Sequence, residues 1–281
     1  MPAVTPFKTL LSAISLFLAA AVLAGCAQVA GTGRSQLRLV SDAELNQQAV
    51  AAYRETLSES KLSSNRKDTA MVKKVGQRIA QAAQEFMDYE GRLSELDGYN
   101  WEFNLIESDD INAWCMPGGK VAFYTGIIPV CRDETGVAVV MGHEVAHALA
   151  HHGAERVSQQ MAAQLGGNIL GTVLGSSNVS GTTAQMIMVG YGLGAQYGVL
   201  MPFSRTQEAE ADRIGLSLMA IAGYNPEEAV AFWGRMADAT GNVSNSDFFS
   251  THPSNPARIK GIQEFIPEAL ERAKRIGVIP K

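Results

Sequence analysis

The sequence predicts an α+β fold that is mainly helical and carries a small antiparallel sheet. Apolar residues recur at helical spacing along most of the chain, only two short segments alternate as strands do, and no internal repeat is visible. The 281 residues, 46% hydrophobic and 18% charged, are enough for a real core. The net charge of -5 and the lack of a basic run argue against a nucleic-acid partner, because a phosphate backbone would gain little from this surface.

The first 25 residues have the pattern of a secretory signal. Lys8 precedes an apolar run at residues 10–23, which is too short for a membrane span. The tetrapeptide LAGC that ends at Cys26 resembles a bacterial lipobox, whose cysteine becomes the lipidated first residue of the mature chain. Ala27, where Asp would retain such a protein at the inner membrane, implies the outer membrane. We therefore expect a lipoprotein anchored there and facing the periplasm; the alternative is an ordinary signal followed by a coincidental cysteine.

Two further cysteines, Cys115 and Cys131, remain once Cys26 is assigned to lipid. Spare thiols in an oxidising compartment often pair. The sequence does not give the distance between these two, so a disulfide and a pair of free thiols both remain open.

A tether is predicted at residues 26–40, which are rich in Gly, Ser, Thr and Gln and have no apolar periodicity. A single domain then follows at residues 41–281. Its first helix opens on a capping-box pattern, Ser41 with Glu44, and is expected to end near residue 58.

A second helix is predicted at residues 68–86 from the spacing of its apolar residues. Alternating apolar and polar residues then indicate strands at 101–106 and 121–125. Turn residues at 117–119 lie between them, so the two strands are expected to form a hairpin or a small sheet.

A buried helix is predicted at residues 133–152, with Gly153 as its stop. Its small residues Gly142, Ala146 and Ala150 would let a neighbouring element approach closely. Capping and stop signals predict further helices at 204–222, from 225 to about 241, and as two short helices opened by Pro256 and Pro267.

Residues 157–204 contain no charged side chain and are rich in Gly, Ala, Met and Gln. Glycine and polar residues interrupt every apolar run well short of the roughly 20 residues that a membrane span needs. Two interpretations remain open: a mobile helical hairpin or lid beside the functional site, or two buried helices packed on the core.

An H-E-x-x-H motif, formed by His143, Glu144 and His147, lies in the predicted buried helix. Residues four apart on a helix share a face, so both imidazoles can reach one metal ion. Zinc suits imidazole, and a catalytic zinc keeps three protein ligands and lowers the pKa of its bound water towards 7. Glu144 would accept a proton from that water and pass it to the leaving amine. The motif predicts a zinc-dependent endopeptidase with one Zn²⁺ per chain; the alternative is an inert helix.

The third ligand is predicted to be Glu208, on a second helix. Asp212 lies one turn further on the same face and would fix a ligand histidine by a hydrogen bond to its far nitrogen. Glu210 points about 200° away from Glu208 and is expected to be a surface charge. The alternative is a solvated acidic face that pairs with Arg205 or Arg213.

The other histidines receive different predictions. His151 lies about 12 Å along the helix axis from His143, too far to share a metal ion, so His151 and His152 are expected to be solvated residues near the helix C-terminus. His252 or Arg258 could stabilise an oxyanion, or His252 could become a fourth ligand that closes the site. The alternative is that His252 and Arg258 only cap the last helices.

These residues resemble the gluzincin peptidases that include HtpX, the CAAX prenyl proteases and the Oma-type mitochondrial protease, and the bacterial periplasmic branch is the nearer likeness. The resemblance implies a zincin-like metallopeptidase domain in which His143, His147 and Glu208 bind zinc and Glu144 is the base. The matching blocks, spread over about residues 41–265, are Asn112-Ala113, the turn at 117–119, residues 143–147, Ser204-Arg205 with Glu208 and Asp212, and His252-Pro253 with Arg258.

The resemblance also implies that the strand after the turn, about residues 120–127, is the edge along which an extended peptide is laid by main-chain hydrogen bonds. The residues assigned to this substrate strand are Gly119, Lys120, Val121, Ala122 and Phe123. Because such binding selects unfolded chain over sequence, we expect unfolded or misassembled envelope proteins as substrates. A second hypothesis is a periplasmic chaperone or assembly factor that works with the outer-membrane assembly machinery and in which proteolysis is secondary or latent.

Overall fold

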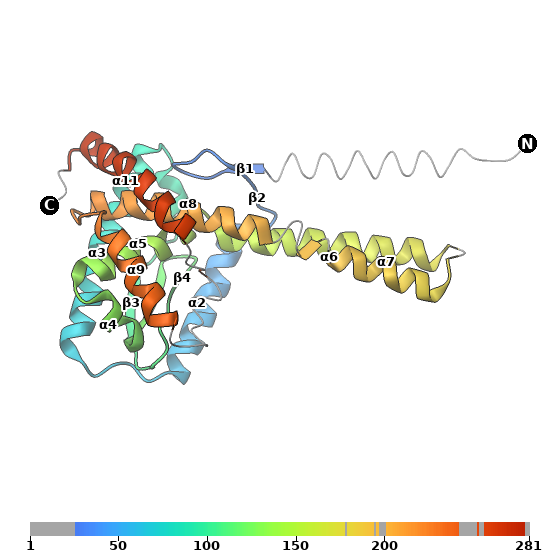
Figure 1. Cartoon of the computed structure of the whole chain (residues 1–281), viewed down its shortest axis with the longest axis horizontal. Helices are drawn as coiled ribbons and strands as arrows, with labels where there is room; N and C mark the ends of the chain where they lie inside the picture. The colour runs from blue at the N-terminus through green and yellow to red at the C-terminus, as the bar shows by residue number, and fades with distance from the viewer. Residues whose placement is uncertain are drawn as a thin grey trace, which may run out of the picture.

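The mainly helical α+β class is confirmed by a computed structural model (Figure 1). The model describes residues 26–177, 179–193, 195–196, 201–241, 252 and 256–278. The predicted signal segment lies outside the described residues, so its assignment stays a prediction. Among the described residues, no helix combines the length and the apolar character that crossing a bilayer requires.

The N-terminal segment is folded onto the domain and is not a free tether. Strands β1 (Cys26–Gln28) and β2 (Ser35–Leu37) form an antiparallel ribbon. Val29 and Ala30, in the turn between them, are buried in the main core. The composition of this segment suggested a tether because the two apolar residues that anchor it are too few to produce a period.

Two helices follow the ribbon, much as predicted. Helix α2 (Asp42–Glu59) is capped by Ser41, whose hydroxyl accepts a hydrogen bond from the Glu44 amide at 3.3 Å. Helix α3 (Arg66–Tyr89) buries the apolar face that its spacing predicted, and the short helix η1 (Leu93–Leu96) leads from it towards the sheet.

The expected small sheet is present, but it is mixed and not purely antiparallel. It contains β3 (Glu102–Ile106), β4 (Ala113–Met116) and β5 (Lys120–Tyr124) in the order β3-β5-β4. Strand β5 runs parallel to β3 and antiparallel to β4. The sequence pattern missed β4 because this strand is only four residues long and three of them are half-buried, so no alternation is visible.

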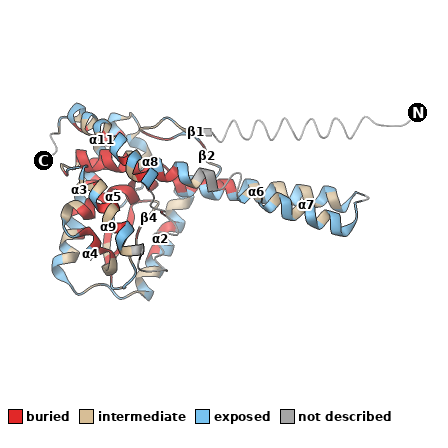
Figure 2. Cartoon of the chain, in the orientation of Figure 1, coloured by how far each residue is buried: buried red, intermediate tan, exposed pale blue. Residues whose placement is uncertain are grey.

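The core helices enclose a central buried helix (Figure 2). Helix α5 (Glu134–Leu149) is buried at nearly every position, and Asp133 caps it by accepting hydrogen bonds from the amides of Thr135 and Gly136 at 2.8 and 3.1 Å. Helices that pack around it or against its neighbours are α4 (Ile128–Cys131, preceded by the short η2, Thr125–Ile127), α8 (Met201–Ile221), α9 (Glu228–Gly241) and α11 (Pro256–Ile276).

Three predicted helix boundaries differ from the structure. The buried helix ends at Leu149, and a new helix begins at His152 after a left-handed residue, His151 with φ 53°. Helix α8 begins at Met201, so Ser204 is not its cap. The two short C-terminal helices are one helix, α11, with Pro267 inside it.

Helices α5 and α8 lie unusually close together. A Cβ atom added to Gly142 of α5 would lie 2.8 Å from the carbonyl oxygen of Gly215, and one added to Gly215 of α8 would lie 2.9 Å from the His143 backbone nitrogen. The close approach expected from the small residues of the buried helix is therefore confirmed at Gly142. It brings the histidine helix and the acidic helix within side-chain reach of each other.

Helices α6 (His152–Gly175) and α7 (Gly181–Leu193) form a hairpin that projects from the domain, and the charge-free segment supplies all of it after residue 156 (Figures 1 and 2). The base of α6 is buried, but most of the described hairpin is exposed or half-buried. The first interpretation is correct in part: the segment is a helical hairpin, and the base of α6 borders the cleft described below through Gly153, Ala154 and Arg156. The second interpretation is wrong, because most of the hairpin is not packed on the core.

Cys115 on β4 and Cys131 at the end of α4 are both free thiols, so the disulfide left open by the sequence is not formed. Burial raises the pKa of both thiols. Both therefore remain protonated, unreactive side chains at neutral pH.

Candidate active site

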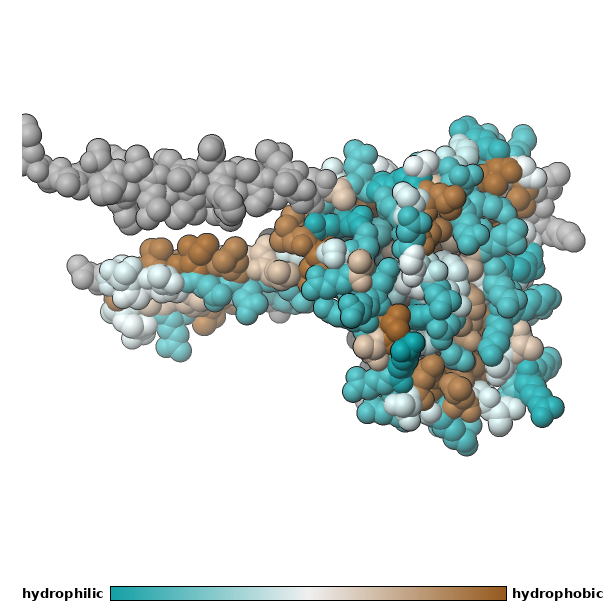
Figure 3. Space-filling model, turned by 180° about the vertical axis from the view of Figure 1, so that it is seen from behind, coloured by the Kyte–Doolittle hydropathy of each residue, from teal (hydrophilic) through white to brown (hydrophobic). Residues whose placement is uncertain are grey.

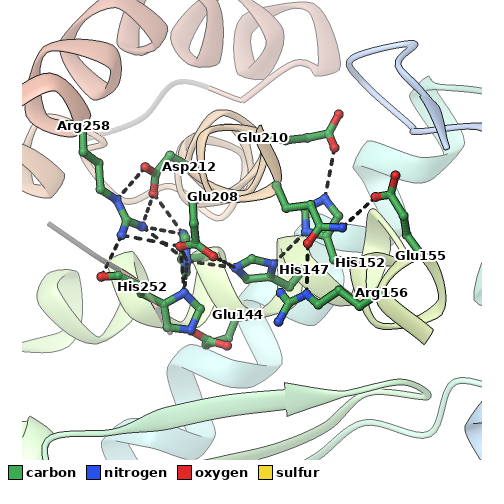
Figure 4. Close-up of polar contacts among 12 residues, drawn as sticks. Glu144, His147, His152, Glu155, Arg156, Glu208, Glu210, Asp212, His252 and Arg258 are labelled. Atoms are coloured by element: carbon green, nitrogen blue, oxygen red, sulfur yellow. Dashed lines mark hydrogen bonds and ion pairs between the residues drawn. The ribbon is translucent and has the colours of Figure 1, made fainter. Parts of the chain in front are cut away.

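Two histidines of α5 and one glutamate of α8 meet at the close approach of these helices (Figure 4). The Nε2 atoms of His143 and His147 lie 3.1 Å apart. The carboxylate of Glu208 places Oε2 3.3 Å from His143 Nε2 and Oε1 3.4 Å from His147 Nε2. All three side chains are buried, so the helices hold them in one geometry.

His252 completes the cluster. Its Nδ1 atom lies 2.8 Å from Glu208 Oε2 and 3.2 Å from His143 Nε2. The four ligand atoms of His143, His147, Glu208 and His252 all lie within 4.8 Å of one another. The sequence left three roles open for His252: oxyanion stabiliser, fourth metal ligand, or helix cap. The position of its imidazole is that of a fourth metal ligand.

The cluster fits zinc in both chemistry and size. Imidazole nitrogens and a carboxylate oxygen are zinc ligands, and ligand atoms about 2.0–2.1 Å from a tetrahedral zinc lie about 3.3 Å from one another. The observed separations of 2.8 to 3.4 Å scatter around that value. The chain therefore provides a site for one Zn²⁺ ion.

Electrostatics at the cluster favour ionised carboxylates. Burial acts to raise the pKa of Glu208, but hydrogen bonds from His143, His147 and His252 hold that pKa well below its usual range. Burial acts to lower the pKa of His143, and hydrogen bonds to Asp212 and Glu208 overcome it and raise the pKa to about 9. A cation is thus favoured at this site in the protein without metal, and zinc would replace the proton of His143.

Glu144 points from α5 into a cleft beside the cluster. Its Oε1 atom is buried and accepts no hydrogen bond from the described residues, and His252 Nε2 lies 3.5 Å from it. Burial raises the pKa of this carboxyl group. A buried carboxylate with a vacant acceptor next to a metal site is placed to bind a water molecule and take its proton.

The cleft has a volume of about 290 Å³ and is bordered by Glu144, His147 and His252 on one side. Strand β4 and its flanks border the other side, through Asn112, Ala113, Trp114, Cys115 and Pro117. Strand β4 pairs with β5 along one edge, and among the described strands none pairs with the other edge. The cleft therefore runs beside an available strand edge.

The prediction that Gly119 and Lys120 to Phe123 form the substrate strand is wrong. Strand β5 is the middle strand of the sheet and is paired on both sides, and its first four residues are buried. It has no main-chain edge to offer to a peptide. The edge that faces the cleft belongs to β4, which the sequence pattern missed.

Asp212 lies where it can orient His143. Its Oδ1 atom lies 2.9 Å from His143 Nδ1, which leaves His143 Nε2 for the metal. Arg258 donates two hydrogen bonds of 2.8 Å to the two oxygens of Asp212, and its guanidinium stacks 3.5 Å from the centre of the Trp233 ring. Arg258 does not border the cleft, so it positions Asp212 and is not placed to hold an oxyanion.

A second chain of contacts, which sequence analysis missed, reaches His147. His147 Nδ1 lies 2.7 Å from His152 Nδ1, and His152 Nε2 lies 3.0 Å from Glu210 Oε2. Arg34, from the turn that precedes β2, donates to Glu210 Oε2 at 2.8 Å and to Glu155 Oε1 at 2.7 Å. With a proton on His147 Nδ1 and on His152 Nε2, every contact from His147 to Arg34 is a hydrogen bond, and His147 Nε2 is left for the metal.

The predictions for Glu210, His151 and His152 were therefore wrong, because all three side chains are buried. Glu210 does point away from Glu208, but that face of α8 packs against α6 and the N-terminal ribbon. His151 Nδ1 lies 3.1 Å from Asp42 Oδ1. The signal in the sequence that could have found these residues is the adjacent pair of histidines, His151 and His152, just before the predicted helix stop at Gly153.

Comparisons with known proteins agree with this geometry. The model of peptidase family M48 matches residues 66–266. The mitochondrial metalloendopeptidase OMA1 of Schizosaccharomyces pombe is 35% identical over 78% of this chain and 60% of its own length. The beta-barrel assembly-enhancing protease of Yersinia pestis is 29% identical over 57% of this chain and 33% of its own length.

Metalloprotease YcaL of Escherichia coli is 23% identical over 69% of this chain and 70% of its own length. The chain spans about half to three fifths of the length of the fungal and zebrafish OMA1 relatives. The family match covers both α5, with its histidines, and α8, with Glu208. The chain therefore belongs to peptidase family M48.

Proposed function

We propose that this protein is a zinc-dependent endopeptidase that hydrolyses unfolded or misassembled envelope proteins at the periplasmic face of the outer membrane. The observation that carries the proposal is the buried Oε1 atom of Glu144, which accepts no hydrogen bond from the described residues, beside a cluster of zinc-type ligands. Family M48 membership supports the peptidase chemistry. The lipobox-like sequence at Cys26 supports the location.

Each residue of the site has a part in peptide hydrolysis. Zinc, when bound, supplies Lewis-acid chemistry that acidifies water and polarises a carbonyl group. Glu144 removes the proton from the attacking water and delivers it to the leaving amine. Asp212 and His152 hold the two ligand histidines through their Nδ1 atoms, so the ligands need not reorganise during the reaction.

The free edge of β4 supports an extended, unfolded substrate. A peptide added to this edge would use main-chain hydrogen bonds and would lie along the cleft beside Glu144. Such recognition requires an accessible backbone, which a folded protein does not provide. One relative is named a beta-barrel assembly-enhancing protease, and this name fits a bacterial envelope role.

A chaperone or assembly factor that works with the outer-membrane assembly machinery is the second candidate. The position of His252 favours it, because an imidazole in the fourth ligand position occupies the place of the attacking water. In that case the β4 edge would bind unfolded chains without cutting them until His252 moves.

A Glu144→Gln variant tests the proposal against a matched control on the same helix, Glu134→Gln. Glu134 lies on the surface and pairs with Lys74. Glu144→Gln is expected to keep its zinc but to cleave casein about a hundredfold or more slowly than the parent. Glu134→Gln is expected to keep both its zinc and the parent's cleavage rate. The measurements are zinc content and cleavage rate, with and without a chelator.

Equal cleavage by Glu144→Gln and the parent protein would disprove the mechanism. If Glu144→Gln cleaves nothing but still rescues an envelope defect in cells, the chaperone hypothesis is correct and proteolysis is secondary.

A further inference from the structure

The projecting hairpin carries an apolar stripe on α6. Val157, Met161, Leu165, Ile169 and Val173 follow one another at every fourth position, and each is between 37% and 57% exposed. Residues four apart are neighbours on a helix surface, and each step advances about 40° around the axis, so they form a continuous stripe about 24 Å long that winds slowly around the helix. Large exposed apolar surfaces of this kind mark sites that bind another molecule or a membrane.

Helix α7 extends the apolar surface. Met186, Val189 and Leu193 are 68%, 58% and 54% exposed. Figure 3 shows apolar residues gathered along one long edge of the hairpin. The exposure does not come from loose packing between the two helices, because Tyr191 of α7 donates a 2.7 Å hydrogen bond to the Ala163 carbonyl and lies against Gly166 of α6.

The stripe is flanked by polar side chains without charge. Gln160, Gln164, Asn168 and Thr172 form the neighbouring stripe on α6 and are also exposed. At the average of the whole chain, 18%, residues 157–204 would carry about nine charged side chains, and they carry none. An exposed helix normally has a charged face towards water. A helix that has an apolar edge and a polar edge can lie in the plane of a membrane interface with its apolar edge among the acyl chains.

The base of the hairpin lies beside the start of the described chain. Strand β2 packs on α6, and the Leu39 amide donates a 2.9 Å hydrogen bond to the Ser158 hydroxyl. Cys26, the predicted lipid attachment point, begins the β1 strand of the same ribbon (Figure 1). The apolar run at residues 10–23 precedes it in the sequence. Whichever of the two holds the chain on a membrane, the hairpin base is held near that membrane.

We propose that the α6–α7 hairpin lies in the interfacial layer of a lipid bilayer, with the central part of the stripe, Met161, Leu165 and Ile169, turned towards the acyl chains. The hairpin and the anchor at Cys26 then give two separate contacts with one membrane, which fixes how the cleft faces the envelope. This inference rests on the membrane anchoring in the proposed function but does not depend on peptidase activity.

Tryptophan substitutions on adjacent stripes test it. Ile169→Trp places an indole on the apolar stripe, and Asn168→Trp is the matched control on the polar stripe. The full chain is reconstituted into phosphatidylethanolamine and phosphatidylglycerol vesicles with brominated acyl chains, which quench indole fluorescence on contact. The three native tryptophans give the same background in the parent and in both variants.

The expected result is strong quenching of the added indole in Ile169→Trp and at least severalfold weaker quenching in Asn168→Trp. Equal quenching at both positions, or none at either, would overturn the proposal. A Leu165→Glu/Ile169→Glu variant, compared with Gln164→Glu/Asn168→Glu, should bind the same vesicles at least tenfold more weakly. Casein cleavage in detergent should be the same in both double variants.

Two other outcomes remain informative. The first is that the parent protein sediments as a dimer, that the Leu165→Glu/Ile169→Glu variant alone is a monomer, and that lipid does not quench Ile169→Trp. In that case a second copy of the chain covers the stripe and the bilayer proposal is wrong. If the quenching pattern holds while Glu144→Gln still cleaves casein, the hairpin inference stands and the proposed mechanism fails.

Discussion

The imidazole of His252 lies in the fourth ligand position of the proposed zinc site. Its Nδ1 atom lies 2.8 Å from Glu208, and its Nε2 atom lies 3.5 Å from Glu144, so one side chain contacts both a ligand and the base. In this position it competes with water for the metal, because a catalytic zinc needs its fourth position free.

Replacing His252 with alanine is therefore expected to raise the rate of casein cleavage severalfold, with zinc still bound by His143, His147 and Glu208. Initial cleavage rates and zinc content measured on the same preparation check this. If cleavage falls while zinc content is unchanged, His252 stabilises the oxyanion of the reaction and does not block the site.

At the scale of elements, the geometry of the site depends on how closely α5 and α8 approach. Gly215 of α8 faces the backbone at Gly142 and His143, and backbone cannot move aside as a flexible side chain can. Glu208 lies on the same helix, two turns before Gly215. Any separation of the helices at Gly215 therefore moves Glu208 away from the histidines.

Gly215→Ala is expected to destabilise the protein by about 1–3 kcal/mol through overpacking and to weaken zinc binding tenfold or more. Gly234→Ala, in α9, is the control, because nothing lies within 4 Å of an added Cβ at that position. It should leave zinc binding unchanged and slightly increase stability, since alanine favours a helix over glycine. Thermal unfolding measures the change in stability, and competition with a chelator measures the change in zinc affinity. Identical behaviour of the two variants would show that the close approach does not set the ligand geometry.

The elements also show what the sequence could and could not predict. Helices α2 and α3 and the spacing of His143, His147 and Glu208 follow local rules of capping and period, and their positions were predictable. The break at His151, the burial of Glu210 and the strand β4 depend on packing between segments far apart in the chain. Glu210, for example, is buried because α6 and Arg34 cover it, and neither contact leaves a local pattern.

At the scale of the whole molecule, the N-terminal ribbon is connected to the zinc site. Arg34 binds Glu155 of α6 and Glu210 of α8, and Glu210 reaches His147 through His152. Burial acts to raise the pKa of Glu210, but hydrogen bonds from His152, Arg34 and Thr32 overcome it and lower the pKa to about 2. A segment next to the predicted membrane anchor thus helps to orient a metal ligand.

Arg34→Ala should therefore weaken both the fold and zinc binding. It leaves Glu210 and Glu155 buried without their cation, which typically costs about 3–5 kcal/mol of unfolding free energy. Removing a residue that supports a metal ligand typically lowers metal affinity by about 10-fold to 100-fold. For Arg34→Ala we expect a loss of zinc affinity of about tenfold, because Arg34 acts on His147 through two other side chains. Arg34→Lys should keep only part of the stability and part of the zinc affinity of the parent, since an ammonium group cannot contact Glu155 and Glu210 at the same time, as a guanidinium does.

The loss of stability should also depend on pH. Because the pKa of Glu210 is lower in the folded protein than in the unfolded chain, its stabilisation is present above about pH 4 and is lost as the pH falls towards 2. In the metal-free protein, the difference in unfolding free energy between the parent and Arg34→Ala should therefore be full at pH 7 and should shrink below pH 4. Denaturant unfolding at pH 7 and pH 3 measures this difference, and a difference that does not change between these pH values would mean that Arg34 acts by packing alone.

The zinc affinity of Arg34→Ala tests the link to the metal site. A zinc affinity equal to that of the parent, despite lower stability, would show that the ribbon supports the fold without orienting His147.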